Sequence, residues 1–73
     1  QKRSLTIAGH RTSLALEPDF WEGLEAIAAS RNLPLAALIR EIDEARGEPN
    51  LSSAIRVAVL RWYADQARQG PSR

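Results

Sequence analysis

The sequence predicts a small α+β fold, mainly α, in which one β-strand precedes three helices. Residues 11 to 16 alternate between the two faces of a strand, and three later stretches repeat apolar residues at helical spacing. Residues that favour turns separate these stretches. A chain of 73 residues has room for one domain and buries only about 60% of its unfolded surface. We therefore expect a single domain over residues 1 to 73 that gains stability from a partner.

The predicted strand, about residues 10 to 17, has one apolar and one polar face. The apolar face is formed by Thr12, Leu14 and Leu16. The opposite face is formed by Arg11, Ser13 and Ala15. Leu5 and Ile7 also alternate, but on odd positions, so the parity changes at Gly9 and His10. This change indicates a bulge or a turn, and the residues before it need not lie in the same ribbon.

Three helices are expected over about residues 18 to 31, 34 to 46 and 50 to 68. Pro18 suits the first turn of the first helix, and the second ends before Gly47 and Pro49. Asn50 or Ser52 can cap the third helix. The third helix is apolar over a wide arc, which a single packing surface does not cover. We therefore expect it to pack across a subunit boundary.

A lone strand leaves its backbone donors and acceptors unpaired, which is costly when they are buried. Pairing with the same strand of a second copy would satisfy them and bury Leu14 and Leu16 against the helices. Two copies would then form one antiparallel intermolecular ribbon. On such a ribbon the polar faces of both chains point outward together, in a patch narrow enough for the major groove of DNA.

Charge is distributed unevenly along the chain. Residues 1 to 16 carry Lys2, Arg3 and Arg11 with no acid, a net charge of +3. Residues 17 to 48 carry eight acids against three arginines, a net charge of −5, and residues 49 to 73 carry +3. A basic front beside an acidic middle suggests a polyanion contacted by the front alone, although an ordinary solvated tail gives the same pattern.

The segment RTSLALEPDFWEGLEAIAASRNLPLAALIREI, residues 11 to 42, resembles the ribbon-helix-helix DNA-binding proteins, the group of Arc and MetJ. The preceding SLTIAGH and the later NLSSAIR are similar to a bacterial subgroup with those added segments. The resemblance implies a homodimer that binds double-stranded DNA through the outward strand residues, here Arg11, Ser13 and Ala15. It also implies a phosphate contact at the start of the second helix, where this chain has Pro34, Leu35 and Ala36.

Lys2 and Arg3 are expected to attract phosphate from a mobile N-terminal arm. His10 is the single histidine and there is no cysteine, so no metal site or cofactor is expected. The longest apolar runs fall far short of the ~20 residues of a membrane span, and the composition is compatible with the cytosol. Glu41, Asp43 and Glu44 fall on different sides of a helix without a partnered nucleophile, so no enzymatic activity is expected.

Two classes of function remain from the sequence. The first is a sequence-specific DNA-binding transcriptional regulator that acts as a homodimer. The second is a protein interaction module, such as an antitoxin-like or adaptor dimer, whose helical surface binds another protein and whose ribbon binds DNA weakly or not at all. The basic front favours the first class, and the low overall basicity together with the apolar start of the second helix favours the second.

Overall fold

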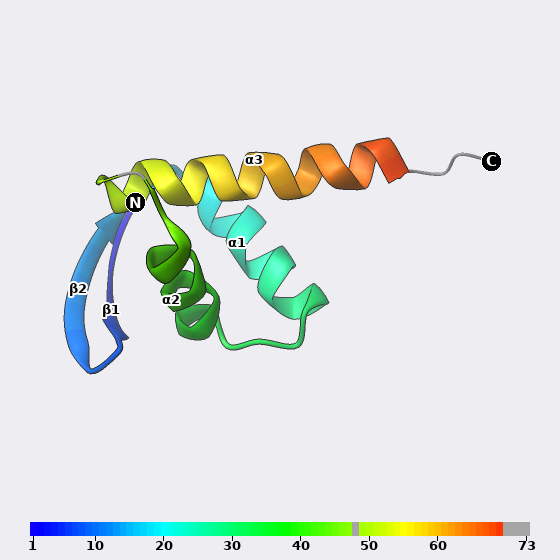
Figure 1. Ribbon diagram of the computed structural model, residues 1–73. Helices are drawn as coiled ribbons and strands as arrows, with labels where there is room; N and C mark the ends of the chain where they lie inside the picture. Colours follow the sequence, from blue (N-terminus) through cyan, green and yellow to red (C-terminus); the bar gives the residue numbers. More distant parts are fainter. Residues whose placement is uncertain (48, 70–73) are drawn as a thin grey trace.

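A computed structural model describes residues 1 to 47 and 49 to 69. Two strands, β1 (Lys2–Ile7) and β2 (His10–Ala15), precede three helices, α1 (Pro18–Ser30), α2 (Leu35–Ala45) and α3 (Leu51–Gln69). The strands form an antiparallel hairpin at one end of the molecule, and α3 crosses above α1 and α2 and extends beyond them (Figure 1). The fold is α+β and mainly α, with a third helix after the ribbon and the first two helices, as the sequence predicts.

The expectation that the strand over about residues 10 to 17 has no partner strand within the chain is wrong. β1 pairs with β2 over the whole register from Lys2 opposite Ala15 to Ile7 opposite His10. Ala8 and Gly9 connect them, and both have positive φ, 53° and 82°. Positive φ at both central residues is the signature of the two-residue type I′ turn, whose twist matches that of a hairpin. The ribbon is therefore intramolecular in this structure.

The same turn explains the change of parity at residues 9 and 10. In a hairpin closed by Ile7 and His10, odd positions of β1 face the same side as even positions of β2. Leu5 therefore lies opposite Thr12, and the apolar residues of both strands share one face. The change of parity was therefore a correct sign of a turn. The expected mobile N-terminal arm is wrong, because residues 2 to 7 form a strand of the ribbon.

Helix α1 has a distinct signal at each end. Pro18 lies in its first turn, where its missing N–H costs nothing, and Asp19 there favours the positive end of the helix dipole. At the other end Asn32 has a positive φ of 59°. Its N–H donates to the carbonyl of Ala29, and the N–H of Leu33 donates to that of Ala28. This is a Schellman motif, which reverses the chain toward α2.

Of the two candidate caps for α3, Asn50 performs the role. Its side-chain oxygen accepts a hydrogen bond of 3.1 Å from the N–H of Ser53, and its carbonyl accepts the N–H of Ala54 at 3.0 Å. The hydroxyl of Ser52 instead donates to the carbonyl of Ala15 over 3.4 Å. The first turn of α3 is thereby placed against the end of β2.

The core lies between the inner face of the hairpin and the three helices. It is formed by Ile7, Leu14, Leu16, Trp21, Leu24, Ile27, Ala28, Leu38, Ile39, Ile55 and Val59. Trp21 is almost fully buried, and its indole N–H donates to the carbonyl of Gln1 at 2.8 Å. Trp62 is half-buried against the same core. Both tryptophans are therefore packing residues.

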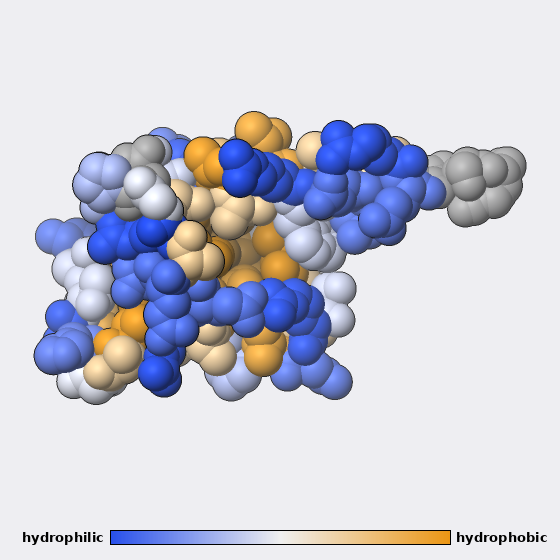
Figure 2. All heavy atoms as spheres, in the orientation of Figure 1, coloured by the Kyte–Doolittle hydropathy of each residue, from blue (hydrophilic) through white to orange (hydrophobic). Residues whose placement is uncertain are grey.

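Helix α3 is covered by its own chain along one side only. Ile55 and Val59 are buried, whereas Val57, Leu60 and Tyr63 are 41%, 66% and 43% exposed. Apolar surface also shows in the hollow below the middle of α3 (Figure 2). Within residues 1 to 47 and 49 to 69, no helix is both long and apolar enough to cross a bilayer.

Candidate nucleic-acid interface

The outer face of the hairpin is a continuous polar surface. Its six residues are all exposed and lie in three cross-strand pairs: Lys2 opposite Ala15, Ser4 opposite Ser13, and Thr6 opposite Arg11. The pairs follow from the alternation of side chains along each strand, which sends the neighbouring residues inward. A pair of serines thus occupies the middle of the face, with one cation toward each end.

Lys2 and Arg11 differ from most basic residues of this chain in their surroundings. Six arginines make ion pairs with carboxylates: Arg3, Arg31, Arg40, Arg46, Arg56 and Arg68. Among the described residues no such pair forms at Lys2, Arg11 or Arg61. The outer face itself carries two cations and no acid, so its positive charge is not neutralised locally.

Arg3 is not brought to this surface. Its guanidinium donates to Glu25 on α1 at 2.9 Å and lies 4.4 Å from the centre of the Trp21 ring. Alternation places it on the inner side of β1, opposite Leu14. Arg3 therefore fastens the hairpin to α1 through an ion pair and a cation–π contact. The structure brings together Lys2, Arg11, Ser13 and Ala15 and leaves Arg3 on the other face.

The nearest acid along the chain is held away from the outer face. Glu17 follows β2 directly and accepts hydrogen bonds from Arg56 on α3, the shorter of them 2.9 Å. The Arg56 hydrogen bond, with help from the local backbone, lowers the pKa of the Glu17 carboxyl below its ordinary value of 4.5. Glu17 is therefore ionised at neutral pH, but Arg56 balances its charge.

The start of α2 lies beside the turn of the hairpin. Thr6, Ile7 and Ala8 line a shallow hollow together with Ala36, Ala37, Arg40, Glu41 and Glu44 of α2. The helix begins after Pro34 without a side-chain cap, and the first N–H groups of any helix lack partners within it. These backbone donors therefore lie near the end of the outer face that carries Thr6.

Arg40, Arg56 and His10 do not belong to the outer face of the hairpin. Arg40 pairs with Glu44 at 3.0 Å, and Arg56 pairs with Glu17, so both arginines are paired with acids of the stretch from residue 17 to residue 48. His10 is exposed at the start of β2. In the part of the chain that the structure describes, no group of His, Asp and Glu residues is arranged to hold a metal ion.

Ser4 and Thr6 were missed in the sequence, although they make up a third of the outer face. They were missed because β1 was not expected to share the ribbon. The signal that identifies them is the spacing of the parity change: two residues, Ala8 and Gly9, separate two alternating runs of opposite parity. That arrangement is the pattern of a hairpin with a two-residue loop.

Comparison with known proteins agrees with this geometry. The profile of the ribbon-helix-helix domain matches residues 1–63. A solved structure, that of an uncharacterized protein from Bordetella pertussis Tohama I, is 38% identical, with a TM-score of 0.82 over 99% of this chain and 62% of that chain. The present chain thus spans less than two thirds of that relative. No match is found among curated proteins.

The chain belongs to the ribbon-helix-helix domain family. This family has a non-enzymatic DNA-binding fold and generally binds DNA as dimers.

Proposed function

We propose that this protein is a sequence-specific DNA-binding regulator of transcription that acts as a homodimer in the bacterial cytoplasm. The observation that carries the proposal is the composition of the hairpin's outer face. Lys2 and Arg11 lie there beside the hydroxyl groups of serine and threonine, and the face itself has no acid. Neither cation makes an ion pair with a described residue. The family supports the choice of DNA as the polyanion, and a similar solved structure comes from a bacterium.

The dimensions of the hairpin suit a duplex. The major groove is about 12 Å wide and admits a two-stranded ribbon, and this ribbon is complete within one chain. Arg11 lies opposite Thr6, which is four residues after Lys2 on β1. Lys2 and Arg11 are therefore about 13 Å apart along the ribbon. This is the rise of about four base pairs. One hairpin can therefore address a short half-site.

Each residue of the face has a chemical role in this proposal. Arg11 can donate two hydrogen bonds to the O6 and N7 atoms of guanine, the commonest specific contact in the major groove. Ser13 and Ser4 donate or accept at neighbouring base edges, and Ala15 offers apolar contact to a thymine methyl group. Lys2 attracts a phosphate, and the free N–H groups at the start of α2 can bind another.

The intramolecular hairpin changes what a dimer brings to DNA. If two copies shared one ribbon, a dimer would have a single reading surface. Here each chain has its own ribbon, so a homodimer carries two, and we propose that its binding site consists of two related half-sites.

The test is a fluorescence polarisation titration with a duplex selected from a random library and with an unselected duplex, each at several salt concentrations. Arg11→Ala should weaken the selected site by about ten- to a hundredfold and reduce discrimination against the unselected duplex. Lys2→Ala should weaken both duplexes alike and reduce the salt slope by about one unit per binding surface. Arg68→Ala, in the last turn of α3 and far from the hairpin (Figure 1), serves as the control and should bind as the wild type does.

If Arg11→Ala bound both duplexes as the wild type does, the hairpin would not read DNA. The protein interaction module would then become the better account of the function. Selection that yielded no preferred duplex, with a shallow salt slope for every variant, would lead to the same conclusion.

A further inference from the structure

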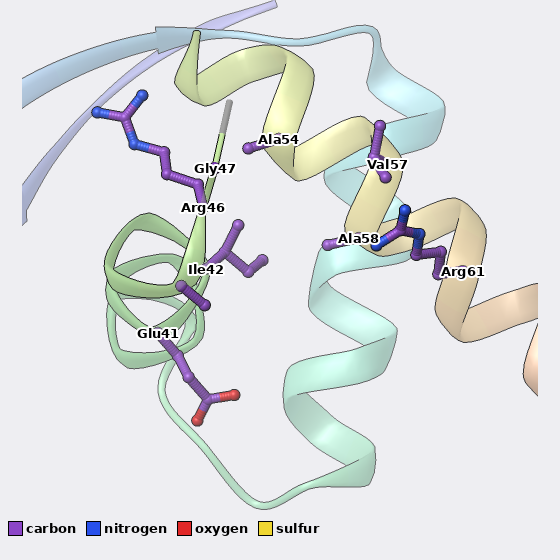
Figure 3. Close-up of a pocket in the computed structure, with 9 residues that line it drawn as sticks. Glu41, Ile42, Arg46, Gly47, Ala54, Val57, Ala58 and Arg61 are labelled. Carbon is purple, nitrogen blue, oxygen red and sulfur yellow. The ribbon is translucent and has the colours of Figure 1, made fainter. Parts of the chain in front are cut away.

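A groove lies in the corner between α2 and α3. It has a volume of about 540 Å³, and sites for small molecules have volumes of about 300 to 1,000 Å³. Ile42 of α2 points across the groove toward Ala54 and Ala58 of α3 (Figure 3). Val57 also lines the groove and is 41% exposed. The groove therefore offers apolar surface that the described chain does not cover.

The groove has a closed end and an open end. Helix α2 ends at Ala45 and α3 begins at Leu51, so a short connection joins the two helices. Gly47 of that connection lines the groove near Ala54, which makes this end closed (Figure 3). Glu41 and Arg61 line the groove at the open end, farther from the connection. A helix of another protein laid along the groove would meet the connection, whereas a small molecule can enter with its apolar end first.

The unbalanced charge of the lining lies at the open end. Glu41 is already neutralised, because its carboxylate accepts hydrogen bonds of 2.6 and 3.1 Å from Arg31. Near the closed end, Arg46 pairs with Asp43 at 2.7 Å. Arg61 makes no ion pair within residues 1 to 47 and 49 to 69. The groove therefore has one cation that is not balanced by a described residue, and it stands at the entrance.

We propose that the groove binds a small amphipathic carboxylate, a medium-chain fatty acid, with its acyl chain in the groove and its carboxylate at the guanidinium of Arg61. One unbalanced cation matches a ligand with one negative charge, and a guanidinium can donate two parallel hydrogen bonds to a carboxylate. Ala54 and Arg61 are seven residues apart on α3, which is about 10 Å along a helix. This length suits an acyl chain such as that of octanoate. The inference does not depend on DNA binding.

The first test is a titration of the wild-type chain with octanoate, followed through its backbone amide chemical shifts by NMR. Saturable shifts should appear at or below millimolar concentration at the residues that line the groove. Octanol has the same chain length without the charge, and it should bind about tenfold more weakly because it cannot accept charge-assisted hydrogen bonds from Arg61. Butyrate should also bind more weakly, because its shorter chain buries fewer methylene groups.

The second test removes or occupies the cation. Arg61→Gln should weaken octanoate binding by about tenfold or more and leave octanol binding unchanged. Val57→Glu places a carboxylate four residues before Arg61, where the two side chains can pair along the helix, and should weaken octanoate binding as well. Both residues are exposed, so both variants should keep the circular dichroism of the wild type.

Each variant has a matched control on α3. Arg68→Gln removes an arginine that does not line the groove. Leu60→Glu introduces an acid beside Arg61 in the sequence, at a position that is 66% exposed and outside the lining. Adjacent residues of a helix do not face each other, so both controls should bind octanoate as the wild type does.

Octanoate that shifts no amide of the groove at millimolar concentration would overturn the inference. Shifts confined to the hairpin would also overturn it, because they would mark anion binding at Lys2 and Arg11 instead. Equal affinities for octanoate and octanol, or an Arg61→Gln variant that binds octanoate as tightly as the wild type, would show that Arg61 does not hold a carboxylate. Either result would overturn the inference.

Discussion

Arg11, on the outer face of the hairpin, and Arg61, in the groove between α2 and α3, both lack an ion pair among the described residues. Their neighbouring side chains differ. Arg11 stands opposite Thr6 and beside serines, on a face with no apolar floor. Arg61 lines a groove whose floor is alanine, valine and isoleucine. The first environment suits a hydrated polyanion, and the second suits the charged end of an apolar ligand. An exposed cation is therefore interpreted from its neighbours rather than from its charge alone.

The largest effect is expected from comparing one substitution on the inner face of the hairpin with one on its outer face. Leu14→Glu places a carboxylate in the core, where Leu14 is 3% exposed, and should abolish folding because an unpaired buried charge costs several kcal/mol. Ser13→Glu, one residue earlier on the outer face, should stay folded, with a stability within about 0.5 kcal/mol of the wild type. It should nevertheless lose DNA binding. Thermal melts and polarisation titrations of both variants check this.

If Leu14→Glu melted cooperatively near the wild-type temperature, the inner face would not belong to the core. If Ser13→Glu bound duplexes with unchanged affinity, the outer face would not meet DNA.

A smaller effect is expected where α1 packs closely against α3. A Cβ atom added at Gly23 would lie 3.0 Å from the Cγ1 atom of Val59. Gly23→Ala should therefore lower the free energy of unfolding by about 1 to 2 kcal/mol, since the overpacking cost exceeds the gain in helix propensity. Gly47→Ala is the control, because nothing lies within 4 Å of its added atom. Urea unfolding measures both, and equal stabilities would show that Val59 has room to move.

The smallest effect concerns the ion pair that links the ribbon end to α3. Arg56 holds the pKa of Glu17 below its ordinary value of 4.5 in the folded protein. The stabilisation is therefore fully present above the unfolded pKa and is lost as the pH falls below 4.5 through the folded pKa. The melting temperature of the wild type should exceed that of Glu17→Gln at pH 7, and the difference should vanish in acid. A difference that does not change with pH would exclude the ion pair as its cause.

The sequence predicted the three helices and the inner and outer sides of β2, because apolar spacing reports directly which side of an element is buried. It failed at β1, because the choice between a bulge and a two-residue turn depends on φ at Ala8, and alanine gives no sign of a positive φ. The misplacement of Arg3 followed from that error. Arg61 and the alanines of α3 were visible in the sequence, but their position around one groove depends on how α2 and α3 cross.

The turn at Ala8 and Gly9 also determines how the ribbon is made. Strand pairing between two chains is a bimolecular event whose rate falls with dilution. Pairing across a two-residue loop is a local event, and hairpins close in about 1 to 10 μs. The surface that we propose reads DNA is therefore assembled as soon as a single chain folds, at any concentration of the protein. Dilution would separate the two copies of the proposed homodimer, but the outer face of each hairpin would stay intact.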